Sequence, residues 1–126
     1  ATVAWALAET PSPASLPMPT SPQLARALEL TEASLVDPPD FAALARASGQ
    51  SPRALTRRFA AEMGMTWREV LRRLRMIRAI EALAAGPASV TEVALSVGYS
   101  SLSAFNAAFR DFTGRTPTDY RASFRS

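Results

Sequence analysis

The side chains most able to do chemistry in this sequence are arginines. All fourteen basic residues among the 126 are arginines, and residues 51–80 carry eight of them against two glutamates. A guanidinium group is planar and donates paired hydrogen bonds, which match the oxygens of a phosphate or the O6 and N7 atoms of guanine. A coding bias of a high-GC genome would equally explain arginine in place of lysine, but it does not explain the concentration of charge in one segment. The clustering therefore indicates binding to a polyanion, with nucleic acid as the first candidate.

Catalytic chemistry has little support. The chain contains no cysteine and no histidine, which excludes disulfides, zinc sites built from these residues and the usual general base. Ser51, Ser89 and Ser101 are nucleophiles by type, but each stands where a helix cap is required, and no base accompanies them. We therefore expect no catalytic residue, no metal site, no cofactor and no enzymatic activity.

The arginine-rich stretch is organised around one long helix, predicted over residues 66–85. Thr66 and Glu69 form a T-x-x-E capping box at its start, and Gly86 with Pro87 ends it. At about 1.5 Å per residue the helix is roughly 30 Å long, close to the roughly 34 Å between successive major-groove openings on one face of DNA. One apolar stripe at spacings of three and four follows it, formed by Trp67, Val70, Leu71, Leu74, Ile77, Ile80 and Leu83.

A first helix-turn-helix is predicted before this helix, over about residues 40–64. Its second helix follows a turn at Gly49 and begins at the cap Ser51, with Pro52 at the first helical position. Residues four apart are expected to face inward, at Leu55, Phe59 and Met63. A different face is available to a partner and carries Arg53, Thr56, Arg57 and Ala60. The same pattern also fits a plain helical hairpin whose charged face is solvated.

The pattern returns after the long helix. It predicts a second helix-turn-helix over about residues 89–114 and a last helix over about residues 116–124. Cap, core and stop positions of the two modules coincide when displaced by 50 residues, and the pairs are Ser51 with Ser101, Leu55 with Phe105, Phe59 with Phe109, and Gly64 with Gly114. Before the turn the displacement is 49, so the second turn holds one extra residue. We therefore expect an all-α fold of about seven helices, with two helix-turn-helix modules of an internal repeat joined by one central helix.

The beginning of the chain has a different composition. Residues 1–20 are rich in Ala, Pro, Ser and Thr without lasting periodicity, which predicts a linker or the tail of a missing upstream domain. The packed domain is then expected over residues 21–126, starting with a short helix behind Ser21. No apolar run reaches the length of a membrane span, and no basic segment of a signal peptide is present. These features predict a soluble, cytoplasmic protein without a membrane partner. If the polyanion that it binds is DNA, we also expect it to associate with the nucleoid.

With the repeat in view, the chain resembles the C-terminal DNA-binding domain of the AraC/XylS family of bacterial transcription regulators, from about Ser21 to Arg121. The ordered set that carries the resemblance is G-Y-S-S from Gly98, then Phe105, Phe109, Gly114, Thr116-Pro117 and Tyr120-Arg121, with Arg75, Ala79 and Leu83 in the central helix. The resemblance implies that each module places its second helix in the major groove. It also implies that the long helix holds both modules on one face of bent DNA.

Carried over by position, the resemblance makes Arg53, Thr56 and Arg57 the base-reading candidates of the first module. The arginines could grip guanine, and Thr56 could contact a thymine methyl group or a phosphate. Ser51 and Ser101 could aim helix N-terminal amides at phosphates. The remaining arginines of the stretch are interpreted as phosphate-facing or solvated charges, and these are Arg58, Arg72, Arg73 and Arg75.

The second module departs from the family pattern. The family usually has a basic residue where this chain has Ala107, and often a polar residue where it has Leu102. The exposed candidates for DNA contacts are then Ser103, Asn106 and Arg110. We therefore expect the first module to supply most of the sequence reading and most of the salt dependence, while the second contributes weaker backbone contacts.

The leading hypothesis is a sequence-specific regulator, expected to be an activator, that binds a double-stranded DNA operator as a two-headed monomeric unit. The resemblance further implies contacts with RNA polymerase and a small-molecule effector sensed by the missing N-terminal domain. The competing hypothesis is an arginine-rich helical module that binds an acidic protein or an RNA surface without DNA sequence specificity. A DNA reader prefers its own duplex site over random duplex by orders of magnitude, whereas a binder of acidic surfaces does not.

Overall fold

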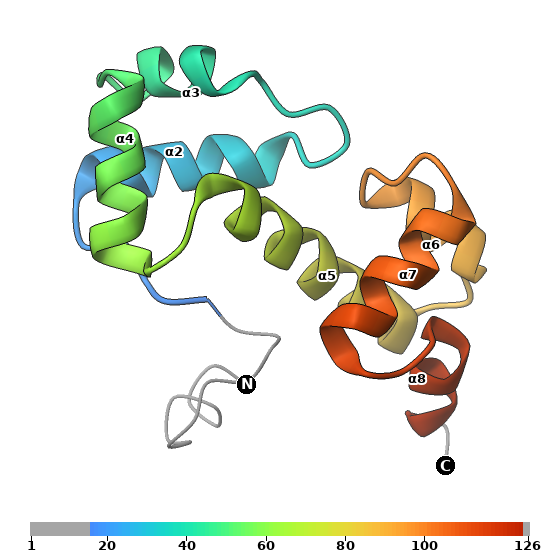
Figure 1. Ribbon diagram of the computed structural model, residues 1–126. Coiled ribbons are helices and arrows are strands. Elements are labelled where there is room, and N and C mark those ends of the chain that lie inside the picture. Colours follow the sequence, from blue (N-terminus) through green and yellow to red (C-terminus); the bar gives the residue numbers. More distant parts are fainter. Residues whose placement is uncertain (1–15, 125–126) are drawn as a thin grey trace. The chain divides into compact units, whose positions relative to one another are not determined.

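The computed structural model describes residues 16–124, and this part of the chain is all-α (Figure 1). A π-helical turn over Phe59–Met63 continues the α-helix Pro52–Arg58 without a break. The prediction of an all-α fold with about seven helices is confirmed. No helix of residues 16–124 is both long and apolar enough to cross a membrane. The elements are α2 (Pro22–Ala33), α3 (Phe41–Ala47), α4 (Pro52–Arg58), η1 (Phe59–Met63), α5 (Trp67–Ala85), α6 (Val90–Ser96), α7 (Leu102–Thr113) and α8 (Pro117–Ser123).

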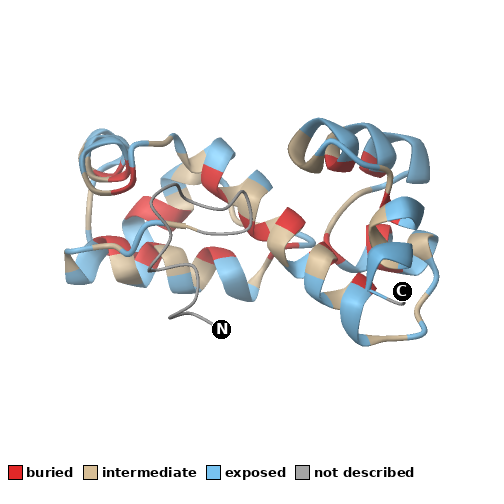
Figure 2. Cartoon of the chain, turned by 90° about the horizontal axis from the view of Figure 1, so that it is seen from below, coloured by how far each residue is buried: buried red, intermediate tan, exposed pale blue. Residues whose placement is uncertain are grey.

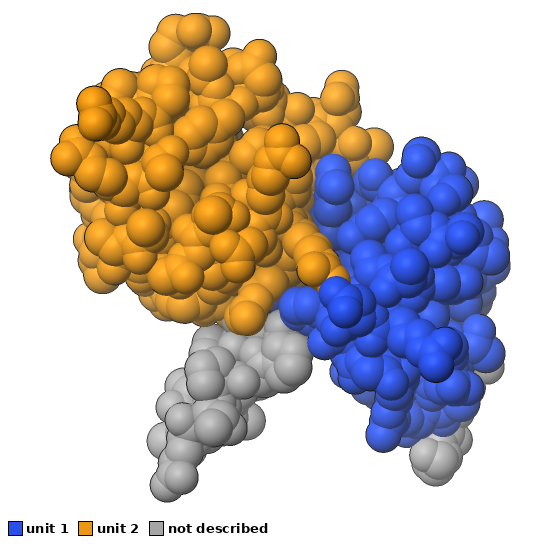
Figure 3. Space-filling view, viewed as in Figure 1, with its two compact units in different colours: residues 1–15, 75–126 blue, residues 16–74 orange. Residues whose placement is uncertain are grey.

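The described residues form two compact units, and the boundary between them falls inside α5 (Figure 3). The N-terminal unit, Leu16–Leu74, is orange in the figure and holds α2, α3, α4, η1 and the beginning of α5. The C-terminal unit, blue from Arg75 onward, holds the rest of α5 with α6, α7 and α8. Each unit has a buried apolar cluster of its own, so each one positions its own pair of helices joined by a turn.

Side-chain caps determine where the described helices begin. At six of these starts the side-chain oxygen accepts a hydrogen bond from the backbone N–H three residues later, and the caps are Ser21, Asp40, Ser51, Ser89, Ser101 and Thr116. At the start of α5, Glu69 N donates to Thr66 Oγ1 at 3.2 Å and Thr66 N donates back to Glu69 Oε1 at 3.1 Å. The predicted capping boxes at Thr66 and Ser89 are therefore confirmed.

The core of the N-terminal unit extends to the first residues of α5. Trp67 is held there by two contacts: its Nε1 donates to Thr31 Oγ1 at 3.1 Å, and its ring lies 5.6 Å from that of Phe41. The indole therefore ties α5 to α2 and α3, with its one polar atom satisfied. The fully buried apolar side chains of this core include Leu24, Leu44, Leu55, Phe59 and Val70.

Packing in this unit begins earlier than the sequence predicts. Leu16 lies against the core, and the backbone N–H of Thr20 donates to Glu62 at 2.8 Å. The described end of the predicted linker over residues 1–20 is thus part of the folded unit, while residues 1–15 lie outside the described residues. A single leucine in a Pro- and Ser-rich run has no periodicity, so the pattern could not reveal its contact.

The C-terminal unit packs around α7. From α8, Arg121 Nε donates to the carbonyl of Leu83 at 3.2 Å, which satisfies an acceptor in the last turn of α5. The guanidinium of Arg75 lies 5.8 Å from the ring centre of Tyr99, so this arginine has a cation–π contact where the sequence predicted a phosphate-facing or solvated charge. The buried core residues here are Met76, Ala79, Leu83, Val93, Ala94, Val97, Phe105 and Phe109.

Helix α5 serves two cores, which corrects the prediction of one continuous apolar stripe. Val70 and Leu74 are buried in the N-terminal unit, whereas the buried residues of the second half are Met76, Ala79 and Leu83. Ile77 and Ile80, which belong to the predicted stripe, are only half-buried. Periodicity indicates which positions of a helix are apolar. It cannot show that those positions belong to two separate core clusters. Figure 2 shows buried positions (red) interrupted by exposed ones along the described helices.

Candidate nucleic-acid interface

The turn between α3 and α4 is fixed by backbone hydrogen bonds. Gly49 has a φ of +77°, in the left-handed region that glycine enters without steric cost. Gln50 N donates to the carbonyl of Ala45 at 2.9 Å, and Gly49 N donates to that of Arg46 at 3.0 Å. These bonds close α3, and the Ser51 cap opens α4 two residues after the glycine. The direction in which α4 leaves α3 is therefore defined locally.

The second helix of this module has one buried and one exposed face. Leu55 and Phe59 are fully buried and Met63 nearly so, as their spacing predicts. The side chains three and four positions apart on the other face are all exposed, namely Arg53, Thr56, Arg57 and Ala60. The exposure predicted for the three base-reading candidates is therefore confirmed. Two guanidinium groups and one hydroxyl lie together on one helical face, available to an anionic partner.

This helix changes its hydrogen-bonding pattern halfway. The sequence predicts one α-helix up to Gly64, but the stretch Phe59–Met63 is a π-helical turn. Its Glu62 reaches back to the start of α2, where the Ser21 hydroxyl donates to Oε2 and the Ser21 N–H donates to Oε1, both at 2.8 Å. Partial burial acts to raise the pKa of Glu62, but the hydrogen bonds from Ser21 and Thr20 outweigh it and lower the pKa to about 2.

Arg58 lies beside this contact. Its Nη1 is 3.7 Å from Glu62 Oε2, and its Nε is buried without a hydrogen-bond partner. The sequence predicts a phosphate-facing or solvated charge at Arg58, whereas the structure gives it a carboxylate partner within the N-terminal unit. With 36% of the side chain exposed, part of the guanidinium still reaches the surface. Ser51, in turn, accepts from Ala54 N at 3.2 Å, so its hydroxyl proton remains able to donate.

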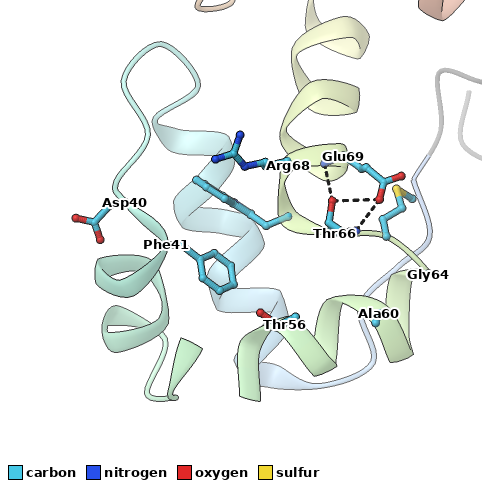
Figure 4. Close-up of a pocket in the computed structure, with 10 residues that line it drawn as sticks. Asp40, Phe41, Thr56, Ala60, Gly64, Thr66, Arg68 and Glu69 are labelled. Atoms are coloured by element: carbon cyan, nitrogen blue, oxygen red, sulfur yellow. Dashed lines mark hydrogen bonds between the residues drawn. The ribbon is translucent and has the colours of Figure 1, made fainter. Parts of the chain in front are cut away.

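A groove borders the exposed face of α4 (Figure 4). It has a volume of about 770 Å³ and is lined on one side by Thr56 and Ala60 and on another by the first residues of α5, including Arg68. Figure 4 shows the Arg68 side chain extended at the edge opposite Thr56. Arg68 is exposed. The sequence does not predict this cation beside α4, because Arg68 lies twelve positions beyond Thr56 and no local spacing relates α5 to α4.

The turn of the second module repeats the first with one more residue. Gly98 has a φ of +101°, and Tyr99 N donates to the carbonyl of Ala94 at 3.0 Å, as Gln50 N does to Ala45. Ser101 then caps α7 by accepting from Ala104 N at 3.1 Å. The cap Ser101 stands three positions after Gly98, whereas the cap Ser51 stands two positions after Gly49. The predicted extra residue in the second turn is confirmed.

Helix α7 also divides into two faces. Phe105 and Phe109 are fully buried, and their rings lie 5.6 Å apart. The predicted contact residues Ser103, Asn106 and Arg110 are exposed, together with Ala107. Leu102, the first residue of the helix, is 40% exposed and is one of the large apolar side chains of the described residues that its own unit leaves uncovered.

Two glutamates near the modules are part of helix caps. Hydrogen bonds from Thr66 lower the pKa of Glu69, and hydrogen bonds from Ser89 lower the pKa of Glu92, so both glutamates are ionised members of capping boxes. Within residues 16–124, no three His, Cys, Asp or Glu side chains gather where they could hold a metal ion. The chemistry that these surfaces offer is hydrogen bonding and charge pairing with an anionic surface.

The comparisons with known proteins identify this arrangement. A family model described as a helix-turn-helix domain matches residues 44–123. A transcriptional regulator from Chromobacterium violaceum, described as containing an AraC-type DNA-binding domain, has a solved structure that is 30% identical, with a TM-score of 0.78 over 82% of this chain and 92% of that one. The chain belongs to the AraC family.

Two curated relatives of this chain are about three times as long as the part that it matches. The transcriptional regulator GlxA of Rhizobium meliloti is 35% identical over 79% of this chain, which is 31% of its own length. The ornithine utilization regulator of Pseudomonas aeruginosa is 37% identical over 78% of this chain and 29% of its own length. The chain therefore spans about a third of the length of these relatives. The DNA-binding domain of AdpA, solved with a target DNA, is 31% identical, with a TM-score of 0.74 over 83% of this chain and 95% of that one.

Proposed function

We propose that this AraC-family chain binds a specific double-stranded DNA site and regulates bacterial transcription. The observation that carries the proposal is the exposed face of α4, where Arg53, Thr56 and Arg57 lie together on the second helix of a helix-turn-helix. In such a motif the second helix enters the major groove and its first turns contact base edges. The 31% identity to the AdpA domain, which was solved with its target DNA, supports the same use here.

The side chains of the first module have distinct roles in this proposal. Arg53 and Arg57 donate paired hydrogen bonds to guanine O6 and N7, and the Thr56 methyl or hydroxyl contacts a thymine or a phosphate. Arg58 and the added candidate Arg68 contact phosphates, which position the module without reading sequence. The capped helix starts at Ser51 and Ser101 add N–H donors toward the backbone of the DNA.

The second module contributes through α7, with Ser103, Asn106 and Arg110 as its polar contacts. Helix α5 has 19 residues and is roughly 28 Å long at about 1.5 Å per residue, a length compatible with modules in successive major grooves. We propose that the DNA-binding domain covers residues 21–126, preceded by a short segment in which Leu16 and Thr20 contact its N-terminal unit. Helix α4 carries three arginines, Arg58 included, whereas α7 carries one. The first module is therefore proposed to contribute most of the DNA affinity and most of its salt dependence.

The regulatory part of the proposal concerns the direction of regulation, RNA polymerase and an effector. Among the relatives, the transcriptional activator RhaR of Pectobacterium atrosepticum is 33% identical over 84% of this chain and 39% of its own length, which favours activation over repression. Contacts with RNA polymerase and a small-molecule effector bound by an upstream domain complete the proposed regulator. The proposed location is the cytoplasm, on the nucleoid.

The deciding experiment is selection of binding sites from a pool of randomised duplex DNA, followed by affinity measurements against salt. We expect one enriched site with two blocks about one helical turn apart, bound at least a thousandfold more tightly than random duplex. Uniform binding to all sequences that disappears at moderate salt would instead support the competing hypothesis. In that case the arginines bind polyanions in general, and the partner is an acidic protein or an RNA.

A further inference from the structure

Helices α4 and α7, the second helices of the two modules, differ in charge at their exposed positions. Displaced by 50 residues, Arg53 corresponds to Ser103, and Arg57 corresponds to Ala107. All four side chains are exposed, so the difference concerns the surface alone. The exposed face of α7 holds no cation before Arg110, in the last turn of the helix. The start of α7, which is the part of a recognition helix that contacts base edges, is therefore uncharged.

The exposed polar group at this start that is suited to paired hydrogen bonds is Asn106. An asparagine amide donates and accepts at once, which matches adenine N6 and N7, whereas guanine offers only acceptors at O6 and N7 and is matched by arginine. Between the start of α7 and Arg110, the exposed side chains near Asn106 are apolar or small. Leu102 lies one helical turn before it and is 40% exposed, and the exposed Ala107 follows it directly.

We propose that the second module selects A·T base pairs, with Leu102 and Ala107 contacting thymine C5-methyl groups and Asn106 bonding adenine. The major-groove edge of an A·T pair presents the adenine hydrogen-bonding pair and the thymine methyl side by side, and a G·C pair has no methyl group. An apolar side chain left uncovered by its own unit gains from burial against that methyl. This inference rests on the proposed function and assigns the base preference of its second module.

Methyl contacts have two measurable properties. Burial of one methyl group changes an affinity by about fourfold, because it corresponds to about 0.8 kcal/mol. The change is independent of ionic strength, since no phosphate charge is neutralised and no counterion is released. The first module, which has arginines at the corresponding positions, should instead select guanine-containing pairs.

The test uses the 126-residue chain and the site obtained by selection from random duplexes. The selection is repeated with the Arg57→Ala variant. The block whose base sequence changes is assigned to the first module, and the other block is assigned to the second. Each thymine of the second block is then replaced by deoxyuridine, which deletes only the C5-methyl group. We expect about a fourfold loss of affinity at one or two positions, unchanged between low and moderate salt, and no loss at thymines between the blocks.

Matched variants connect the loss to the two side chains. Leu102→Ser and Ala107→Ser change exposed residues and leave the Ser101 cap intact, and the helical circular dichroism signal verifies the fold. With both substitutions the deoxyuridine effect should fall below about 1.5-fold. A second block rich in G·C pairs, or an A·T block that is insensitive to deoxyuridine, overturns the inference while the regulator remains. Failure to enrich any site overturns the proposed function itself.

Discussion

The carboxylate of Glu62 accepts two hydrogen bonds from Ser21, one from its hydroxyl and one from its backbone N–H, each at 2.8 Å. The two residues are 41 positions apart, and the contact joins the π-helical turn behind α4 to the first turn of α2. Ser21 Oγ also accepts from Leu24 N at 3.2 Å, so one hydroxyl serves as the cap of α2 and as a donor to η1. The proposed recognition helix is thereby anchored at its far end.

The stability of the N-terminal unit should depend on pH through Glu62. The pKa of this residue is lowered from 4.5 to about 2 in the folded state, so the unfolded state binds the proton more readily. The stabilisation is therefore fully present above about pH 5 and is lost as the pH falls toward 2. Urea unfolding between pH 2 and pH 7 should show this loss, and it should be largely absent in Glu62→Gln.

The Glu62→Gln variant should also be less stable at neutral pH. Hydrogen bonds to a charged acceptor contribute about 1.5 to 3 kcal/mol, and the amide weakens them. The exposed acid Glu29, which faces away from the core on α2, provides the control, because Glu29→Gln should change stability by less than about 0.5 kcal/mol. Equal stability of Glu62→Gln and the unaltered chain would contradict the anchoring role.

Alanine should be destabilising at the left-handed position of the first module's turn. A Cβ atom added at Gly49 meets no atom within 4 Å, so the cost of Gly49→Ala arises from the backbone at φ +77° and amounts to about 1 to 2 kcal/mol. Gly86→Ala is the matched control, because Gly86 lacks a positive φ and the nearest atoms would be 3.9 Å from the new Cβ. Thermal or urea unfolding distinguishes the two, and a similar cost for both would refute the argument.

The bond between Trp67 and Thr31 should be measurable as a coupling energy. Trp67→Phe removes the N–H donor, and Thr31→Val removes the fully buried acceptor. Thr31 also donates to the carbonyl of Ala27 at 2.8 Å, so its own substitution costs more than one bond. A double-mutant cycle isolates the shared contact, and we expect a coupling of about 0.5 to 1.5 kcal/mol. Strict additivity of the two substitutions would show that the bond contributes nothing.

The two modules should differ in their contributions to DNA affinity. Arg57→Ala should weaken binding to the selected site about tenfold to a hundredfold and relax the preference for guanine in the first block, because a paired contact with a base is lost. Asn106→Ala should cost less and leave the salt slope unchanged. Arg26→Ala, an exposed arginine on α2, serves as the control for net charge alone. Similar losses for Arg57→Ala and Asn106→Ala would contradict the imbalance between modules.

Local chemistry made much of this architecture readable from the sequence. Ser51 and Ser101 fix where the second helices begin, and the spacing of Phe105 and Phe109 fixes which face packs inward, so the exposed faces followed directly. These signals act within one helical turn, and the repeat doubled each of them. The roles of the exposed residues on DNA stay predictions, since exposure alone does not select a partner.

What the sequence did not reveal depends on contacts between distant segments. The bonds from Ser21 to Glu62 cross 41 positions, and the approach of Arg75 to Tyr99 joins α5 to the second turn. Met76 is buried and Ile77 is only half-buried, because the C-terminal unit has a separate core that includes Met76. Helix propensity likewise provides no signal for the π-helical turn that begins at Phe59.

The division of α5 between two cores has a consequence for proteolysis. The boundary after Leu74 lies among Arg72, Arg73 and Arg75, whose following peptide bonds are substrates for trypsin. A protease needs several residues of extended backbone, so cleavage there requires the middle of the helix to unwind. The rate of nicking at these arginines therefore reports how often α5 opens between its two cores. A single cut would convert one chain with two modules into two fragments with one module each.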